Sequence, residues 1–332
     1  MIDKNLGIHR TKQFMAKPFK YNCLWIIFLL SSFACQTDHN SVDELDGATN
    51  DVKSSLQQHT VLSDGHLMNV WEKKAENTKG AILFIHGRTW SSLPNFDLQV
   101  ADEELSLMDG MVAQGYTAYA LDLRGYGATP RDSTEWLSPN KAASDILNVL
   151  NWISSQNQGI KVHLFGYSMG STSSLLAAQK SPEDIASLTV FGYWQDLDTQ
   201  IPENPDEQLQ KIVNTAEAAA SDFITPGSIS QVAIDAYVKS ALADDPIKVD
   251  WRYVHQFNDI NPSSISTPVL VLQGALDPIA PTDRQAKLFT RLKTFDKSWV
   301  VISGGDHAAF LEASRKDLIH SLTAFIDRFN EY

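Results

Sequence analysis

Cysteine is almost absent from this chain of 332 residues, which contains only Cys23 and Cys35. Because no cysteine follows residue 35, disulfide bonds cannot stabilise the rest of the chain, and zinc sites built from cysteine pairs are excluded there. The sequence also has no His-x-x-x-His motif and no Gly-x-Gly-x-x-Gly segment after a predicted strand. These are the usual sequence signals of metal and dinucleotide sites. We therefore predict that the protein uses no metal ion and no other cofactor.

Positive charge is scarce as well. The chain has 27 lysines and arginines against 40 aspartates and glutamates, which gives a formal net charge of -13. A protein that binds nucleic acid needs a basic surface that displaces counterions from phosphates, so we expect no nucleic-acid partner. The length and the hydrophobic share of 43% suit one large α/β domain or two smaller ones.

A long hydrophobic run is also missing. The uncharged stretch 23–34, which follows several lysines, is shorter than the roughly 20 residues that a membrane-spanning helix needs. It suits the apolar part of a secretory signal peptide, which we place at residues 1–34, with Met1 or Met15 as the start. The sequence Leu-Ser-Ser-Phe-Ala-Cys that ends at Cys35 resembles a bacterial lipoprotein cleavage box. This resemblance implies that Cys35 becomes the lipidated first residue of the mature chain.

The segment after Cys35 is polar and acidic. It cannot bury enough apolar surface to fold, so we interpret residues 35–56 as a flexible tether. Gln36 stands where many lipoproteins of the inner membrane carry aspartate, so the resemblance implies a lipid-anchored protein of the bacterial cell envelope, at the outer membrane. A plain signal peptide, which would give a secreted or periplasmic protein, and an uncleaved anchor are the alternatives.

The rest of the chain alternates predicted strands with predicted helices. This alternation indicates a doubly wound, mostly parallel sheet, preceded by a hairpin whose turn is at 63–66. The alternation is interrupted at 195–262, which we interpret as a helical cap insertion between core segments 57–194 and 263–332. Predicted strands are 81–85, 116–121, 162–165, 188–193, 268–272 and 299–302, and predicted helices are 97–114, 140–156, 171–180, 208–223, 230–243, 282–292 and 309–329.

Ser168 stands in the sequence Gly166-Tyr167-Ser168-Met169-Gly170, between a predicted strand and a predicted helix. A serine between two glycines in this context suits a nucleophile elbow, a sharp turn that presents the hydroxyl group at the end of the sheet. Side chains at the flanking positions would collide there, which explains the glycines. A serine in an ordinary strand-to-helix turn is the alternative.

A serine nucleophile needs a base, usually a histidine that a carboxylate orients. His307 follows the predicted strand 299–302, and Asp277 follows the strand 268–272. Both are therefore expected at the carboxyl ends of parallel strands, where open α/β sheets form their sites. Asp196, which also follows a predicted strand, is the alternative acid.

These motifs, together with the pair His86-Gly87 after strand 81–85, resemble those of serine hydrolases of the α/β-hydrolase superfamily in both type and order. The similarity is to capped members such as monoacylglycerol lipase and proline iminopeptidase, and it covers about residues 60–332. It implies that Ser168 is the nucleophile, His307 the base and Asp277 the acid that orients the base.

The resemblance also implies that the backbone N–H groups of Arg88 and Met169 form the oxyanion hole. Arg88 departs from the small or apolar residue that is usual at its position. Its guanidinium group either pairs with an acid of the cap or meets a substrate carboxylate, and we expect the pairing. Aromatic residues near the predicted strand ends either line a substrate pocket or pack between cap and core: Trp90, Tyr126, Tyr193 and Trp194.

We therefore expect a cofactor-free serine hydrolase that cleaves small carboxylic esters through an acyl-enzyme intermediate. A serine at the nucleophile position argues against the chemistry of haloalkane dehalogenases and epoxide hydrolases, which resemble this fold but use a carboxylate. An aminopeptidase or amidase with the same triad is the alternative. A surface-binding protein that kept the fold without the activity is a third.

Overall fold

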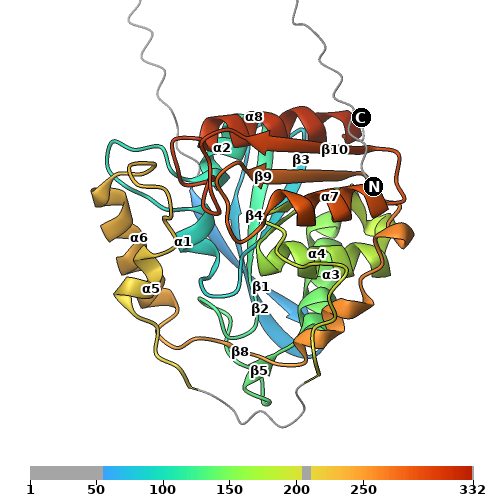
Figure 1. Cartoon of the computed structure of the whole chain (residues 1–332), viewed down its shortest axis with the longest axis horizontal. Coiled ribbons are helices and arrows are strands. Elements are labelled where there is room, and N and C mark those ends of the chain that lie inside the picture. The colour runs from blue at the N-terminus through green and yellow to red at the C-terminus, as the bar shows by residue number, and fades with distance from the viewer. Residues whose placement is uncertain (1–54, 204–210, 331–332) are drawn as a thin grey trace, which may run out of the picture. The chain divides into compact units, whose positions relative to one another are not determined.

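An eight-stranded sheet forms the centre of the computed structural model, which describes residues 55–203 and 211–330 (Figure 1). The strand order is β1-β2-β4-β3-β6-β7-β9-β10, and all neighbours from β4 onward are parallel, whereas β1, β2 and β4 pair antiparallel. The strands are β1 (Leu56–Ser63), β2 (His66–Lys73), β3 (Gly80–Ile85), β4 (Tyr116–Asp122), β6 (Val162–Tyr167), β7 (Ile185–Phe191), β9 (Val269–Gly274) and β10 (Lys297–Ile302).

The first two strands form the predicted hairpin. Asp64 and Gly65 connect them, and both have a positive φ, at 47° and 77°. A two-residue loop of this type matches the right-handed twist of the paired strands, and glycine adopts it without steric cost. The turn sequence is therefore sufficient to explain where the hairpin reverses.

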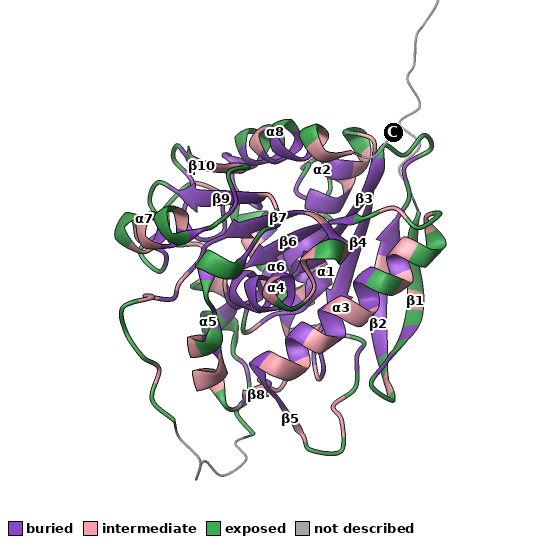
Figure 2. Cartoon of the chain, turned by 90° about the vertical axis from the view of Figure 1, so that its right-hand side faces the viewer, coloured by how far each residue is buried: buried purple, intermediate pink, exposed green. Residues whose placement is uncertain are grey.

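The central strands are buried on both faces. Every residue of β3, β4, β6 and β9 is buried, which explains their nearly continuous apolar sequences. Helices cover the two faces, α3 and α4 on one and α2 and α8 on the other, each over its own apolar cluster (Figure 2). The core helices are α1 (Ser92–Phe96), α2 (Leu107–Ala113), α3 (Pro139–Gln156), α4 (Met169–Lys180), α7 (Thr282–Arg291) and α8 (Arg315–Ile326).

The sequence of α3 shows why these helices form. Ser138 caps the helix by accepting a hydrogen bond from the N–H of Lys141, and Pro139 occupies the first turn, where no intrahelical acceptor is lost. Ile146, Leu150 and Ile153 then recur at helical spacing and are buried against the sheet. The apolar stripe thus determines which side of α3 faces the core.

Two predicted helices are shorter in the structure. The segment 97–114 is helical only over α2, because Asp97 turns its carboxylate inward to accept hydrogen bonds from Lys73 Nζ and from Ser106 Oγ, both at 2.6 Å. The last helix begins at Arg315 rather than at residue 309, since residues 303–314 form the loop that carries His307. In both cases tertiary contacts override the helical spacing.

The predicted cap segment 195–262 contains helices α5 (Ala216–Ala220) and α6 (Gln231–Asp244), which lie beside α1 (Figure 1). The predicted helix 208–223 is therefore much shorter, and residues 208–210 lie outside the described residues. A short strand that the sequence did not predict, β8 (Asp250–Trp251), pairs in parallel with β5 (Trp136–Leu137). This pairing joins the end of the cap segment to a loop of the core.

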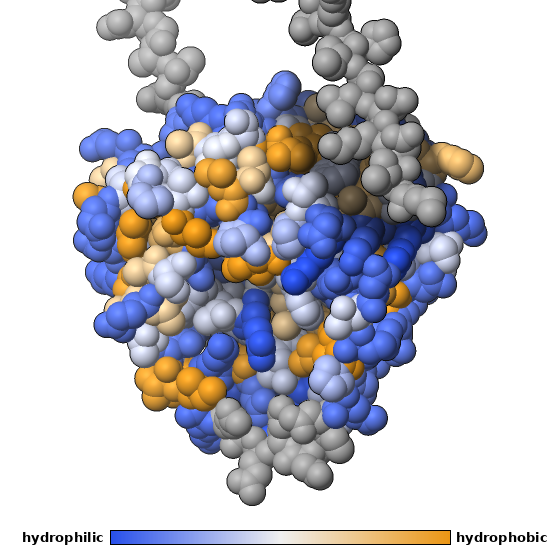
Figure 3. All heavy atoms as spheres, viewed as in Figure 1, coloured by the Kyte–Doolittle hydropathy of each residue, from blue (hydrophilic) through white to orange (hydrophobic). Residues whose placement is uncertain are grey.

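The helices of the described residues do not meet the requirements for spanning a membrane. None of the described helices has the length and apolarity that crossing a bilayer requires. Hydrophobic residues at the surface gather in several separate patches on the face shown in Figure 3. The predicted signal peptide, Cys35 and nearly all of the predicted tether lie outside the described residues.

A buried ion pair connects three elements of the core. Arg124, in the loop after β4, donates through Nε and Nη2 to the carboxylate of Asp145 in α3, with both distances at 2.7 Å. Ser63 Oγ at the end of β1 donates to the same carboxylate at 2.6 Å. Hydrogen bonding to Asp145 raises the pKa of the Arg124 guanidinium above its usual value. Asp132 also accepts from Arg124 Nη1, at 3.1 Å. Removing Asp145 would therefore leave the buried Arg124 with this longer ion pair alone, and Ser63 Oγ without its acceptor.

We predict that Asp145→Ala lowers the free energy of unfolding by about 3–5 kcal/mol, measured by urea denaturation. The matched control is Asp296→Ala, because Asp296 pairs with Arg328 at 3.3 Å at the surface. That change should cost less than about 1 kcal/mol. Equal losses for the two variants would contradict the importance of the buried pair.

Candidate active site

Ser168 occupies a strained turn between β6 and α4, with φ of 53° and ψ of -120°. A Cβ atom at Gly166 would lie 2.5 Å from the carbonyl oxygen of Gly170, and a Cβ atom at Gly170 would overlap the carbonyl oxygens of Ile85 and His86. Both glycines are therefore required by the close approach of α4 to the ends of β3 and β6. The backbone N–H of Ser168 donates to the carbonyl oxygen of Phe191 at 2.8 Å, which ties the turn to the end of β7.

His307 and Asp277 form a hydrogen-bonded pair. Asp277 Oδ2 lies 2.7 Å from His307 Nδ1, and both side chains are buried. The other carboxylate oxygen, Oδ1, accepts from the N–H groups of Ile279 and Ala280 at 2.8 and 3.0 Å. These two donors fix the carboxylate. An ionised carboxylate in this position favours the imidazole tautomer with its proton on Nδ1, which leaves Nε2 able to accept a proton.

The loop of His307 is held by two further carboxylates. Asp306 accepts from the N–H of Ala308 at 2.9 Å and from the N–H of Thr225, in the cap segment, at 2.7 Å. Glu312 accepts from the N–H of Asp306 at 3.1 Å, and burial raises the pKa of its carboxyl group to about 7. The position of His307 thus depends on its own loop and on the cap.

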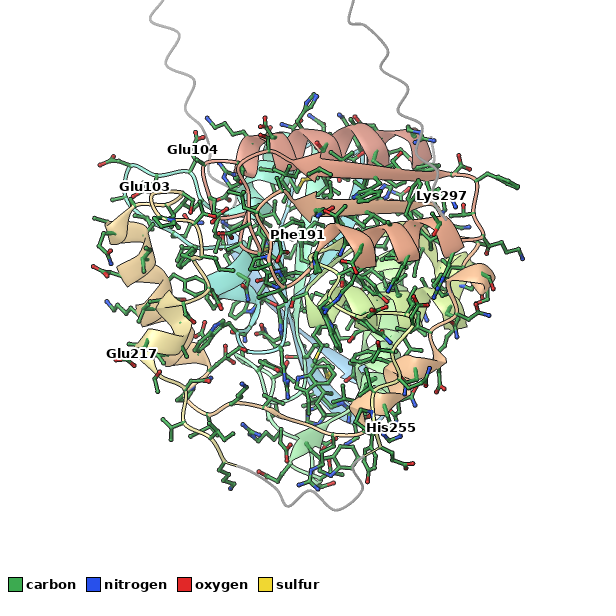
Figure 4. The ribbon with its side chains drawn as sticks, viewed as in Figure 1. Glu103, Glu104, Phe191, Glu217, His255 and Lys297 are labelled. Carbon is green, nitrogen blue, oxygen red and sulfur yellow. The ribbon has the colours of Figure 1, made fainter. Side chains whose placement is uncertain are left out.

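The end of β7 brings Ser168 and His307 to one place. Gly192, which follows Phe191, lies against the imidazole, since a Cβ atom there would be 2.8 Å from His307 Cε1. The aromatic ring of Tyr167 packs against the same imidazole, with 5.1 Å between ring centroids. Among the hydrogen bonds of the described residues there is none between Ser168 Oγ and His307, and catalytic hydrogen bonds are often long until substrate is bound. Figure 4 shows Phe191 in the interior, between the cap helices and α7, whereas His255 lies at the periphery.

His86 shapes the loop that faces Ser168. Its Nδ1 donates to the carbonyl oxygen of Gly87 at 2.9 Å, and its Nε2 accepts from the N–H of Leu123 at 3.1 Å. This pattern requires a neutral imidazole. Burial lowers the pKa of His86 to about 4, although the charge of Asp122 partly opposes the shift. Gly87 lies next to Ser168, because a Cβ atom there would be 3.2 Å from Ser168 Cβ.

The two expected oxyanion donors are both available. Arg88 N–H donates no hydrogen bond within the described part of the chain, and Met169 is the first residue of α4, where an N–H group has no intrahelical acceptor. The carbonyl oxygen of Arg88 accepts from the hydroxyl of Tyr126, which in turn accepts from Trp251 Nε1 at 2.7 Å. This chain of hydrogen bonds orients the Arg88 peptide.

The aromatic residues for which the sequence left open a pocket role or a packing role are mostly buried. Tyr126 and Tyr193 are fully buried, and Trp90 is only 3% exposed. Trp194 is half-buried and packs edge-on against Phe257. Their burial favours the packing role for Trp90, Tyr126 and Tyr193. The guanidinium of Arg88 is exposed, and no acid among the described residues pairs with it, contrary to the pairing that we expected.

Asp196, the alternative acid, is engaged elsewhere. Its carboxylate accepts from Lys287 Nζ at 2.7 and 2.9 Å, and this interaction lowers the pKa of Asp196. The structure thus places Asp277, and not Asp196, on His307.

Asp222, which the sequence analysis did not single out, is brought near the site by the cap. It accepts from the hydroxyl of Tyr237 at 3.0 Å and lies within electrostatic reach of His307, and burial raises the pKa of its carboxyl group. No local pattern marks it, since its position depends on how α5 and α6 dock.

The described residues contain no cluster of histidine, cysteine and acidic side chains that could hold a metal ion. The pair of His307 and Asp277 beside Ser168 is instead suited to proton transfer and covalent catalysis at a carbonyl group.

Comparisons with known proteins identify the family. A family model described as serine aminopeptidase, S33, matches residues 76–314. The sequence is 24% identical over 280 residues to 2-(acetamidomethylene)succinate hydrolase of Mesorhizobium japonicum, covering 78% of this chain and 91% of the relative. It is 22% identical to lysophosphatidylserine lipase ABHD12 of Macaca fascicularis over 66% of this chain, but spans only 47% of that relative's length.

Solved structures show the same fold. The crystal structure of E-2-(acetamidomethylene)succinate hydrolase matches with a TM-score of 0.57 and 22% identity, covering 82% of this chain and 100% of that chain. A membrane phospholipase A described as a bacterial virulence factor matches with a TM-score of 0.59 and 18% identity, covering 83% and 87%. The predicted α/β-hydrolase fold is confirmed.

We predict that His86 makes stability depend on pH. Its pKa falls from 6.5 in an unfolded chain to about 4 here, so between these values the unfolded chain binds a proton that the folded chain excludes. The free energy of unfolding should therefore decrease as the pH falls through this window, by up to about 3 kcal/mol. The measurement is urea denaturation at several pH values. His86→Gln should lower the slope of the free energy of unfolding against pH by the amount that corresponds to about one proton. The exposed control His320→Gln should leave it unchanged, and equal slopes for all three proteins would contradict the assignment.

Proposed function

We propose that this chain, which belongs to the serine aminopeptidase S33 family of hydrolases, is a serine hydrolase. It cleaves carboxylic esters through a triad of Ser168, His307 and Asp277. The observation that carries the proposal is the fixed His307–Asp277 pair beside the strained turn of Ser168. The name of one relative, a lipase, supports ester hydrolysis.

The geometry suggests the following reaction. Ser168 Oγ attacks the ester carbonyl carbon while His307 Nε2 takes the hydroxyl proton, and Asp277 stabilises the imidazolium through Nδ1–H. The N–H groups of Arg88 and Met169 donate to the oxyanion of the tetrahedral intermediate. The carbon–oxygen bond of the ester then breaks, and His307 gives its proton to the leaving alcohol. Water, deprotonated by His307, attacks the acyl-enzyme and releases the acid and Ser168.

The first test is the nucleophile. A fluorophosphonate probe should label the wild-type protein but not Ser168→Ala, and this variant should not hydrolyse p-nitrophenyl butyrate. Asp277→Asn should fold but lower kcat by about 10⁴-fold, because the carboxamide favours the wrong imidazole tautomer.

The matched control for the acid is Asp196→Asn. Asp196 binds only Lys287 and a backbone N–H among the described residues, so its change should leave kcat within about twofold. A larger loss in Asp196→Asn than in Asp277→Asn would show that the acid is misassigned. Hydrolysis by Ser168→Ala at the wild-type rate would refute the proposal.

Aminopeptidase activity is the second candidate. It is favoured by the description of the family model and by the Asp222 carboxyl group near His307, which can bind a substrate ammonium group. Assays with aminoacyl-naphthylamides beside the esters separate the two. A higher kcat/KM for the amides, weakened by Asp222→Asn, would favour the peptidase.

We also propose that the mature chain is anchored to a bacterial envelope membrane through lipidated Cys35. One acyl chain binds a membrane only marginally, whereas several together give stable attachment. Cys35→Ser should therefore abolish palmitate labelling and release the protein from the membrane fraction, while Cys23→Ser should change neither. Membrane association of Cys35→Ser without label would indicate an uncleaved anchor instead.

A further inference from the structure

Arg88 is an exposed cation at the candidate oxyanion hole. It follows Gly87, which lies next to Ser168, and its carbonyl oxygen is held by Tyr126. Its guanidinium forms no ion pair and donates no hydrogen bond within the described residues, although other arginines of the chain are paired with acids, as Arg124 is with Asp145. No acid among the described residues thus neutralises this cation beside Ser168, although the chain has a net charge of -13.

The backbone around Lys248 is held against the loops that follow β3 and β4. Asp245 accepts from the N–H groups of Ser91 and Gly127 at 2.7 and 3.0 Å, which fixes the segment after α6 against both loops of the site. Arg131 donates to the carbonyl oxygen of Lys248 at 3.3 Å. Lys248 is half-buried on this fixed backbone, and its ammonium group has no hydrogen-bond partner among the described residues.

The charge of Arg88 reaches Lys248. Burial first, and then the positive charge of Arg88, lower the pKa of the Lys248 ammonium group. The nearby acids do not neutralise them: the Asp245 carboxyl group accepts backbone N–H groups and has its pKa raised to about 7 by burial, and Asp250 pairs with Arg252 at 3.0 Å. An anion between Arg88 and Lys248 would offset both the burial cost and the mutual repulsion.

We propose that Arg88 and Lys248 form an anion-binding subsite at the candidate active site, and that the preferred substrate is a carboxylic ester that carries a carboxylate or phosphate group. The inference rests on the proposed function, since it names the substrate class of the same site. The planar guanidinium group of Arg88 can donate two parallel hydrogen bonds to two oxygens of the anion. The ammonium group of Lys248, a compact positive charge, adds a further contact to an oxygen of the same anion. The subsite explains why arginine stands where a small or apolar residue would suffice for the backbone donor.

The test uses two matched substrate pairs with the full-length protein. The carboxylate pair is the p-nitrophenyl monoester of adipic acid against p-nitrophenyl hexanoate, and the phosphate pair is 1-acylglycerol 3-phosphate against 1-acylglycerol. The wild-type protein should favour the anionic member of at least one pair by about tenfold in kcat/KM. The pair that shows the preference identifies the anion.

Arg88→Gln, which keeps the backbone N–H, and Lys248→Met should each reduce this preference about tenfold, mainly through a higher KM for the anionic substrate. The matched control is Lys239→Met, because Lys239 is an exposed lysine on α6 and should leave the preference unchanged. No preference for an anionic substrate in the wild-type protein, or an equal preference in the wild-type protein and both variants, would overturn the subsite.

If the protein shows no esterase activity, the proposed function is refuted, but the anion-binding subsite can still be tested by direct binding. Calorimetric titration of the wild-type protein with glutarate and with inorganic phosphate should then show binding that Lys248→Met weakens about tenfold. Absence of binding, or equal binding by the wild-type protein and Lys248→Met, would exclude the anion site.

Discussion

The close approach of α4 to the carboxyl ends of β3 and β6 is the constraint on which the site depends. Only glycine fits at Gly166 and Gly170, and this contact forces Ser168 into backbone angles that a serine rarely adopts. The strain is sustained because the strands on either side are fully buried and cannot shift. The turn also places the N–H of Met169, which has no intrahelical acceptor, beside the hydroxyl group, so the proposed nucleophile and the proposed oxyanion donor are adjacent residues of one turn.

Buried carboxylates hold the remaining loops around that turn. Asp277 receives two backbone N–H groups besides His307, and Asp245 bridges the loops after β3 and β4 from the end of the cap. Asp122 does the same from β4, since it accepts from the N–H of Ser92 and from the side chains of Asn69 and Trp71. Each carboxylate satisfies donors that irregular backbone would otherwise leave unpaired in the interior, which is how loops without regular structure become rigid enough to position a base.

The cap contributes more than a cover over the core. Its Thr225 binds Asp306 beside the candidate base, its Asp222 lies within electrostatic reach of His307, and Lys248 stands at its end near Arg88. Charges of both signs are thus presented to one small region by a segment with little sheet structure of its own. In this arrangement the core supplies the proposed chemistry and the cap supplies groups that can select the substrate.

Local sequence determined much of this protein. The alternating strands and helices predicted the sheet, and short motifs placed Ser168, Asp277 and His307 at strand ends, because strand ends and glycine turns depend on neighbours in sequence. Other features were decided only by tertiary structure. Helix 97–114 was interrupted by a buried contact of Asp97, and Tyr126 became a support for the Arg88 peptide rather than part of a pocket. Arg88, which no described acid pairs with, and Lys248 likewise come together from positions more than a hundred residues apart. Residues so far apart in the sequence come together only when the whole chain packs, and a local sequence pattern does not specify that packing.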